Sequence, residues 1–160
     1  MSEPPHASSW ATPPEFYLDE NVAGKAARRY VADLGYKVHS PASVFGRALL
    51  DEGLRDDQWL RVVGARGWAV IGRDQRIFEW GDELRAYLDA QLHMFLLPGE
   101  VTREQIIELL ETNLVEMCTL AVARRPNVYW LTRRGVEPYE RRAERRSRRR
   151  TRRRRSPPER

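Results

Sequence analysis

The chain has 160 residues, of which 41% are apolar, and this is enough for one folded domain with tails. A single cysteine, Cys118, excludes an internal disulfide framework and a tetracysteine zinc site, and no apolar run approaches the roughly 18 residues of a transmembrane helix. The net charge of +5 combines 12 Arg and 2 Glu in residues 141–160 with 16 basic and 21 acidic residues in 1–140. An acidic body with a strongly basic tail indicates a polyanionic partner.

Both ends of the chain have compositions typical of disorder. Residues 1–14 contain four Pro and several small polar residues, which predicts a disordered leader. They have neither a cationic start nor an apolar stretch, so they do not resemble a secretory signal, and we expect a cytoplasmic protein. Residues 136–160 form an arginine-rich tail that repels itself and buries no core, which predicts disorder in the free protein.

The apolar pattern begins at residues 16–18, a short continuous run that predicts a buried parallel strand ending in a polar turn. Apolar residues over 22–34 then recur with the spacing of one helix face. Asn21 can cap this helix and Gly35 can end it. Residues 36–39 are predicted as a second short strand.

The next part of the chain is less regular. Residues 40–55 are expected to hold one short helix around 44–50, within a connection of a length that is often functional. Asp56 lies at or near the N-cap of the following helix. Residues 68–71 are a third continuous apolar strand, followed by Gly-Arg-Asp at 72–74.

The alternation continues to the end of the body. Residues 84–91 share a helix face, and 94–97 form a strand that a Pro-Gly pair ends. The sequence Thr-Arg-Glu-Gln at 102–105 fits a capping box and opens a long helix with apolar residues over 106–121. Residues 128–131 are the last predicted strand.

These strands are continuous apolar runs, which is typical of strands buried on both faces in a parallel sheet. Their alternation with amphipathic helices predicts an α/β fold. We therefore expect a compact three-layer α/β/α sandwich around a mainly parallel sheet, occupying residues 15–135.

Several carboxylates fall where this fold brings chain segments together. Asp19 and Glu20 directly follow the first strand, and Asp74 directly follows the third. Asp56 begins the helix that leads into the third strand. Ligands collect at the carboxyl ends of parallel strands, where crossover helices also start, so Asp19, Asp56 and Asp74 are expected to converge on one rim.

Clustered carboxylates repel one another unless a cation or a shared proton lies between them. An all-oxygen site suits Mg²⁺ or Mn²⁺ rather than zinc. Such an ion can orient a water, lower its pKa and offset charge on a phosphoryl group, so a phosphodiester is the natural substrate.

Each of these residues also has an ordinary structural interpretation. Asp19 and Asn21 are common turn residues after a strand, and Asp56 is most simply a helix cap. Asp74 also fits an ordinary turn. Their joint placement at one edge is what favours a functional site.

Three segments together resemble the PIN-like domain family, especially the compact branch that contains VapC-type toxins of toxin–antitoxin pairs. They are FYLDEN at 16–21, DDQWL at 56–60 and VIGRDQRIF at 70–78. The resemblance covers residues 15–80 well and 81–132 more loosely. The spacing of Asp56 and Asp74 is similar to that of the last two acidic positions of the family.

The resemblance implies a compact α/β/α fold and cleavage of RNA that depends on Mg²⁺ or Mn²⁺. It implies that Asp19, Asp56 and Asp74 are catalytic and hold the metal ion. Asp57 is the close rival of Asp56, and Glu20 is a further candidate metal ligand.

Two positions depart from the family's pattern. Gly72 stands where many members have Thr or Ser, so one hydroxyl contact is missing. Fuller PIN domains carry an acidic residue on an intervening helix, and here only Asp51, Glu52 or Glu20 stands in its place.

Basic and polar residues near these acids are candidates for binding substrate. Arg73 and Arg76 flank Asp74 and are placed to hold substrate phosphates, although solvated or carboxylate-paired arginines are equally consistent with the sequence. Lys25 is a weaker candidate of the same kind. Asn21 completes the predicted substrate-binding set.

We therefore expect a metal-dependent endoribonuclease that is the toxin of a toxin–antitoxin pair. Its partners would be RNA and an antitoxin protein, and a homo-oligomer is left open. A phosphoacceptor receiver module is the second hypothesis, although Arg133 and Arg134 stand where a receiver has lysine. The third is a catalytically silent RNA-binding protein whose tail attracts RNA in a salt-dependent way.

Overall fold

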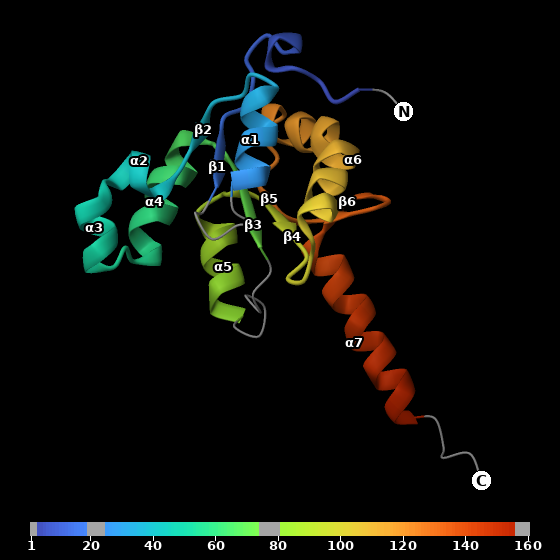
Figure 1. The fold of residues 1–160 in the computed structure, drawn as a ribbon. Coiled ribbons are helices and arrows are strands. Elements are labelled where there is room, and N and C mark those ends of the chain that lie inside the picture. Colours follow the sequence, from blue (N-terminus) through green and yellow to red (C-terminus); the bar gives the residue numbers. More distant parts are fainter. Residues whose placement is uncertain (1–2, 19–24, 74–80, 156–160) are drawn as a thin grey trace.

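The computed structural model of the chain describes residues 3–18, 25–73 and 81–155 (Figure 1). The strands form one sheet in the order β2-β1-β3-β4-β5-β6, parallel from β2 through β5, with β6 antiparallel to β5. They are β1 Phe16–Leu18, β2 Val38–His39, β3 Ala69–Arg73, β4 His93–Leu97, β5 Asn127–Thr132 and β6 Gly135–Pro138. The predicted mainly parallel sheet is confirmed.

Helices cover both faces of this sheet. They are η1 Ala7–Ser9, α1 Lys25–Asp33, α2 Pro41–Phe45, α3 Arg47–Glu52, α4 Asp56–Arg66, α5 Gly81–Asp89, α6 Arg103–Val122 and α7 Tyr139–Arg155. α1 and α6 pack with Phe16 and Ile71 on one face, whereas α4 and α5 pack with Tyr17 and Val70 on the other. Successive strand residues point to opposite faces, so continuous apolar strands require helices on both sides. The predicted three-layer α/β/α sandwich is thereby confirmed.

The long helix α6 begins at the predicted capping box. The Thr102 N–H donates to Gln105 Oε1 (2.9 Å), and the Gln105 N–H donates to Thr102 Oγ1 (3.2 Å). Further along, Leu110 and Leu114 are fully buried against the sheet. The Nδ2 of the buried Asn113 amide donates to the Leu109 and Thr132 carbonyl oxygens, whereas its Oδ1 has no hydrogen-bond partner among the described residues. Within the described ranges, no helix combines the length and apolar character needed to cross a membrane.

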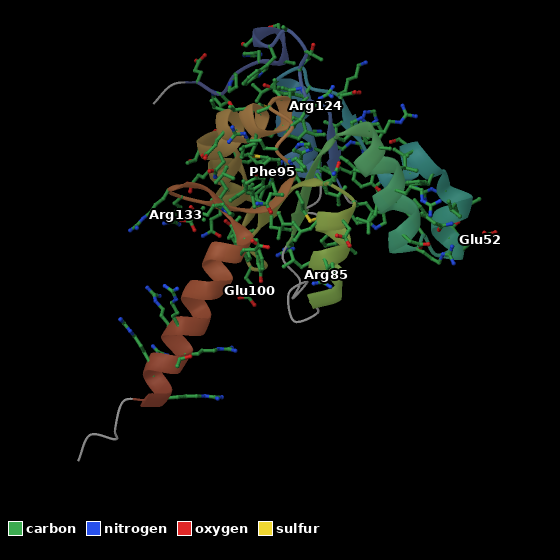
Figure 2. The ribbon with its side chains drawn as sticks, turned by 180° about the vertical axis from the view of Figure 1, so that it is seen from behind. Glu52, Arg85, Phe95, Glu100, Arg124 and Arg133 are labelled. Atoms are coloured by element: carbon green, nitrogen blue, oxygen red, sulfur yellow. The ribbon has the colours of Figure 1, made fainter. Side chains whose placement is uncertain are left out.

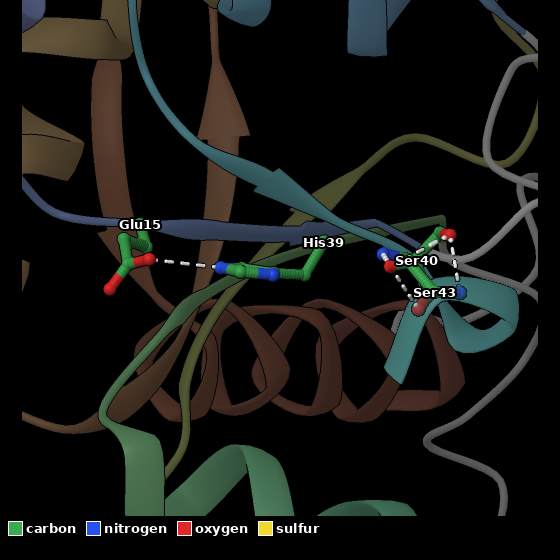
Figure 3. Close-up of polar contacts among 4 residues, drawn as sticks. All are labelled: Glu15, His39, Ser40 and Ser43. Carbon is green, nitrogen blue, oxygen red and sulfur yellow. Dashed lines mark hydrogen bonds and ion pairs between the residues drawn. The ribbon is translucent and has the colours of Figure 1, made fainter. Parts of the chain in front are cut away.

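The connection after β2 holds two short helices where the sequence predicted one. Ser40 caps α2 through reciprocal bonds with Ser43, as Figure 3 shows. Gly46 then adopts φ +83°, a conformation that interrupts a helix and that glycine tolerates readily. The prediction of a single helix around 44–50 was therefore wrong, because one glycine divides the segment into α2 and α3.

The described part of the leader packs on the body. Residues 7–9 form η1, and the Ala7 N–H donates to the Leu34 carbonyl oxygen (2.9 Å). The Trp10 indole donates to the Tyr36 hydroxyl (3.0 Å), which in turn donates to the Pro5 carbonyl oxygen (2.8 Å). These contacts differ from the predicted disorder of the leader, since composition does not reveal that Ala7 and Trp10 find partners in the core.

The described part of the arginine-rich tail, residues 136–155, also differs from the disorder predicted for 136–160. β6 pairs with β5, and Glu116 of α6 accepts a hydrogen bond from the Val136 N–H (3.1 Å). Tyr139 stacks on Trp130 with ring centroids 5.7 Å apart, and α7 follows, pointing away from the body in Figure 1. A hairpin partner and an aromatic contact order the start of this segment, and arginine is a good helix former.

The buried histidine His93 gives folding a pH dependence. It begins β4 with 5% of its surface exposed, and neither ring nitrogen has a hydrogen-bond partner among the described residues. Burial lowers the pKa of this imidazole below its usual 6.5, so the folded protein favours the neutral ring. The unfolded chain binds this proton more tightly, and stability therefore falls as the pH drops below 6.5.

We expect His93→Leu to lose less stability than the wild type between neutral pH and about pH 5, because the variant has no imidazole to protonate. The difference is at most about 1.4 kcal/mol per pH unit, and denaturant unfolding at several pH values measures it. The exposed His6→Gln variant is the matched control and should follow the wild type. Parallel stability curves for His93→Leu and wild type would contradict the argument.

Candidate active site

Two parallel strands end side by side at the carboxyl edge of the sheet. β1 pairs with β3, and Leu18 lies level with Ile71. The next residue along the chain after Leu18 is Asp19, and the one after Arg73 is Asp74. The prediction assumed that the first and third strands end at the same edge of the sheet. The described ends of β1 and β3 support that assumption.

Most of the predicted site residues lie outside the described residues. These are Asp19, Glu20, Asn21, Asp74 and Arg76. Their side-chain positions, and the convergence of the carboxylates, remain predictions.

The helix α4 packs on the face of the sheet that is opposite to α1 and α6. It ends at Arg66, shortly before β3 begins, so its first turn points toward the carboxyl edge. The Trp59 ring stacks on Tyr17 of β1, with centroids 5.9 Å apart and planes 6° from parallel. Asp56 lies one turn before Trp59 and is the first residue of the helix. The N–H of the preceding residue, Arg55, donates to Gln58 Oε1 (3.1 Å). The Asp56 carboxylate itself lies outside the described atoms.

The acidic residues that are described near α4 face solvent. Asp57 Oδ1 lies 3.4 Å from Arg55 Nε, and both side chains are more than half exposed. An exposed pair of this kind contributes little to stability. Asp51 and Glu52 are exposed on α3, and Figure 2 shows Glu52 at the periphery of the molecule.

Two predicted substrate-binding residues, Lys25 and Arg73, line one cleft between α1 and α6. The cleft has a volume of about 460 Å³, and Arg29 and Arg103 also line it. Its apolar wall includes Ile106. Among the described residues, no carboxylate forms an ion pair with any of these four basic side chains.

Arg73 is the most firmly placed of the four basic side chains. It is the last residue of β3, level with Leu97 of β4, and it is half-buried. Its Nε donates a short hydrogen bond to the Gly99 carbonyl oxygen (2.6 Å). This bond fixes the guanidinium against the loop that follows β4, at the edge where β1 and β3 end.

Sequence reasoning missed Arg29 and Arg103 as cleft residues. Arg29 is four residues after Lys25, and side chains at this spacing lie on the same side of a helix. This signal was available in the sequence. Arg103 opens α6, and its proximity to α1 depends on helix packing that no local pattern specifies.

The glycine at position 72 has a packing explanation. A Cβ atom at Gly72 would lie 3.2 Å from the Leu96 side chain in the neighbouring strand, closer than most contacts of this kind. A Thr or Ser here would therefore need Leu96 to move. The missing hydroxyl is consistent with close packing between β3 and β4.

The described residues contain no group of three or more His, Cys, Asp or Glu side chains suited to a metal ion. The predicted ligands lie largely outside that search. The predicted ligands are all carboxylates. Carboxylate oxygens suit Mg²⁺ or Mn²⁺, whereas the set contains none of the thiolate or imidazole ligands typical of zinc sites. The described thiol is no alternative nucleophile, because Cys118 is fully buried and burial raises its pKa to about 11.

Comparison with known proteins places the chain in a family. A family model described as "PIN like domain" matches residues 14–99, more than half of the chain and all of β1 to β4. No curated protein and no solved structure matched. The carboxyl edge with its two adjacent strand ends therefore lies within the matched region, and the chain belongs to the PIN-like domain family, whose members are generally nucleases that use divalent metal ions.

Proposed function

We propose that the protein is a metal-dependent endoribonuclease that hydrolyses RNA phosphodiester bonds, with its nuclease domain at residues 15–135. The single observation that supports this most strongly is the parallel pairing of β1 with β3 inside the region that matches the family. That pairing brings the two chain positions before Asp19 and Asp74 to one edge. The first turn of α4, with Asp56, points toward the same edge.

In this proposal Asp19, Asp56 and Asp74 hold Mg²⁺ or Mn²⁺, with Glu20 and Asp57 as further ligands. The bound ion would supply a water of lowered pKa and offset charge on the phosphoryl group. The remaining work falls to the protein's cationic and polar side chains.

Those side chains bind and orient the RNA backbone. Arg73 is held by Gly99 and can donate its remaining guanidinium hydrogens to a phosphate. Lys25 adds a second positive charge in the same cleft. Asn21 and Arg76 complete the proposed substrate contacts from the segments that follow β1 and β3.

A receiver module remains the alternative function, and one observation favours it. The order β2-β1-β3-β4-β5 is also the strand order of the doubly wound fold found in receivers. The family match and the residues after β5, Arg133 and Arg134, favour the nuclease instead. Stable labelling of Asp74 by a small phosphodonor would support the receiver.

The resemblance of the motifs to VapC-type proteins extends the proposal to a toxin of a toxin–antitoxin pair. An antitoxin would then restrain the nuclease, and covering the carboxyl edge is the simplest way to do so. The substrate would be cytoplasmic RNA. Growth arrest on expression of the wild type, relieved by Asp74→Asn, would support this role.

We expect Asp74→Asn to abolish most metal-dependent RNA cleavage, because the amide weakens the metal site while preserving the shape of the side chain. A loss of about a hundredfold or more in kcat is typical when a group that stabilises transition-state charge is removed. Cleavage of a labelled RNA in Mn²⁺ or Mg²⁺ measures it.

The exposed Asp89→Asn variant, at the end of α5, is the control and should cleave like the wild type. Equal rates for wild type and Asp74→Asn would refute the assignment. RNA binding without cleavage in either metal would instead favour a catalytically silent RNA-binding protein.

We further expect the arginines of α7 to attract RNA through its phosphates. Arg148, Arg149 and Arg150 are exposed, and the α7 side chains that Figure 2 draws project into solvent. Replacing all three by Gln in the full chain should weaken RNA binding at low salt. The slope of log affinity against log salt should become shallower by about 0.7 for each phosphate that the variant no longer neutralises.

The matched control replaces the same three arginines by Lys, which keeps the charge and should keep the slope. Filter binding or anisotropy over a salt series measures both quantities. An unchanged affinity and slope for the Gln variant would show that this part of α7 is only a solubilising extension.

A further inference from the structure

We propose that the cleft between α1 and α6 binds one nucleotide of the single-stranded RNA substrate beside the scissile bond, with a phosphate on its basic side chains. This inference rests on the proposed nuclease function and specifies where the substrate strand runs. It adds Arg29 and Arg103 to the residues that contact substrate. It also places part of the strand over the α1 and α6 face of the sheet.

The charge of the cleft indicates an anionic ligand. Lys25, Arg29, Arg73 and Arg103 bring four positive charges to one small volume, although residues 1–140 are net acidic. No described carboxylate pairs with them, so their mutual repulsion is not relieved by any described ion pair. A phosphate bound among them would relieve it, because opposite charges within a few ångströms attract strongly near a protein surface.

The fold fixes where these charges lie. Lys25 and Arg29 are one turn apart on α1, Arg103 begins α6, and Arg73 ends β3. The helices α1 and α6 are in contact with each other over the same sheet face, as Figure 1 shows. The hydrogen bond from Arg73 Nε to the Gly99 carbonyl oxygen then ties the end of β3 to the loop before α6. Three separate elements thus present donors to one volume, and Arg73 is held in place among them by its hydrogen bond.

The size and lining of the cleft fit a nucleotide better than a bare ion. Its volume of about 460 Å³ lies in the range of small-ligand sites, which is roughly 300–1,000 Å³. Val101 and Ile106 contribute an apolar wall, and Ile106 is almost fully buried. An apolar surface beside a cationic one suits the ribose and base that accompany each phosphate, whereas a free phosphate would use only the basic side.

The position of the cleft connects it to the chemistry. Arg73 directly precedes Asp74, so the cleft adjoins the edge where the catalytic carboxylates are proposed to lie. A nucleotide held there places the neighbouring phosphodiester of the same strand toward that edge. Single-stranded RNA meets this requirement because its backbone can enter a narrow cleft, and its sequence-independent binding depends on such phosphate contacts.

The test uses the full-length double variant Arg29→Gln/Arg103→Gln and a short fluorescent oligouridylate. Binding is measured in EDTA, so that cleavage does not interfere. We expect the affinity to fall by about tenfold or more, because the variant cannot form two charge-assisted hydrogen bonds to phosphate. The slope of log affinity against log salt should become shallower by about 0.7, the value for one phosphate of a single strand that is no longer neutralised. In cleavage assays KM should rise while kcat changes little.

The matched control is Arg124→Gln, at the opposite end of α6 from Arg103. Both arginines are exposed, and a helix of this length separates them by about 30 Å. Figure 2 shows Arg124 at the end of the molecule opposite to α7. This variant should bind the oligonucleotide like the wild type. A further variant, Arg29→Lys/Arg103→Lys, should recover most of the affinity, which shows that the loss reflects charge and not misfolding.

The outcomes separate the cleft from the nuclease itself. If the wild type cleaves RNA but the Gln double variant keeps its affinity and salt slope, the cleft proposal is overturned and the nuclease stands. If the protein never cleaves RNA but the double variant still loses binding, the cleft is a nucleotide site on a protein without the proposed activity. A loss in log affinity for Arg124→Gln of half the double variant's loss or more would also overturn the proposal, because one removed charge would then have the effect that overall charge alone predicts.

Discussion

The parallel pairing of β1 with β3 is the constraint on which the rest of the structure depends. β1 has only three residues, yet it lies between β2 and β3, and its register with β3 sets Phe16 opposite Ala69 and Leu18 opposite Ile71. A shift of this register by one residue would turn its apolar side chains to the wrong faces. The same pairing sets which two strands end as neighbours at the carboxyl edge. It therefore determines the packing of the core and, in our proposal, the placement of the site.

Much of this arrangement could be predicted from the sequence because the signals are local. Continuous apolar strands indicate burial on both faces of the sheet. The predicted capping box gives the start of α6 correctly, since Thr102 is the N-cap of that helix. The elements that were missed depend on distant partners. β6 exists because β5 lies beside it, and the leader is placed by Trp10 and Tyr36, which are far apart in sequence. Gly46 differs from these cases, because the glycine that separates α2 from α3 is a local signal and could have been used to predict two helices.

The proposed site divides in the same way. That acids follow the first and third strands is a statement about sequence, and what the structure describes is that these two strands end as neighbours at one edge. The cleft is different, because Arg29 and Arg103 come from α1 and α6 and meet only through the packing of these helices on one sheet face. Composition reports the net acidity of residues 1–140 but not this local concentration of positive charge. In our proposal the two charges have different origins, since the carboxylates follow strands in the sequence whereas the cations of the cleft meet between two helices.

The boundary of the family match gives this difference of origin a further meaning. The match ends at residue 99, so the strand ends, Lys25, Arg29 and Arg73 lie inside it, whereas Val101, Arg103 and Ile106 lie beyond it. The Gly99 carbonyl oxygen, which holds Arg73, stands at the junction. In our proposal the chemistry therefore belongs to the region that matches the family, and three of the seven residues that line the cleft belong to α6 and the loop before it. In this proposal a change in α6 can alter how RNA binds without replacing any of the residues that hold the metal ion, because Asp19, Asp56 and Asp74 all lie outside α6 and the loop before it.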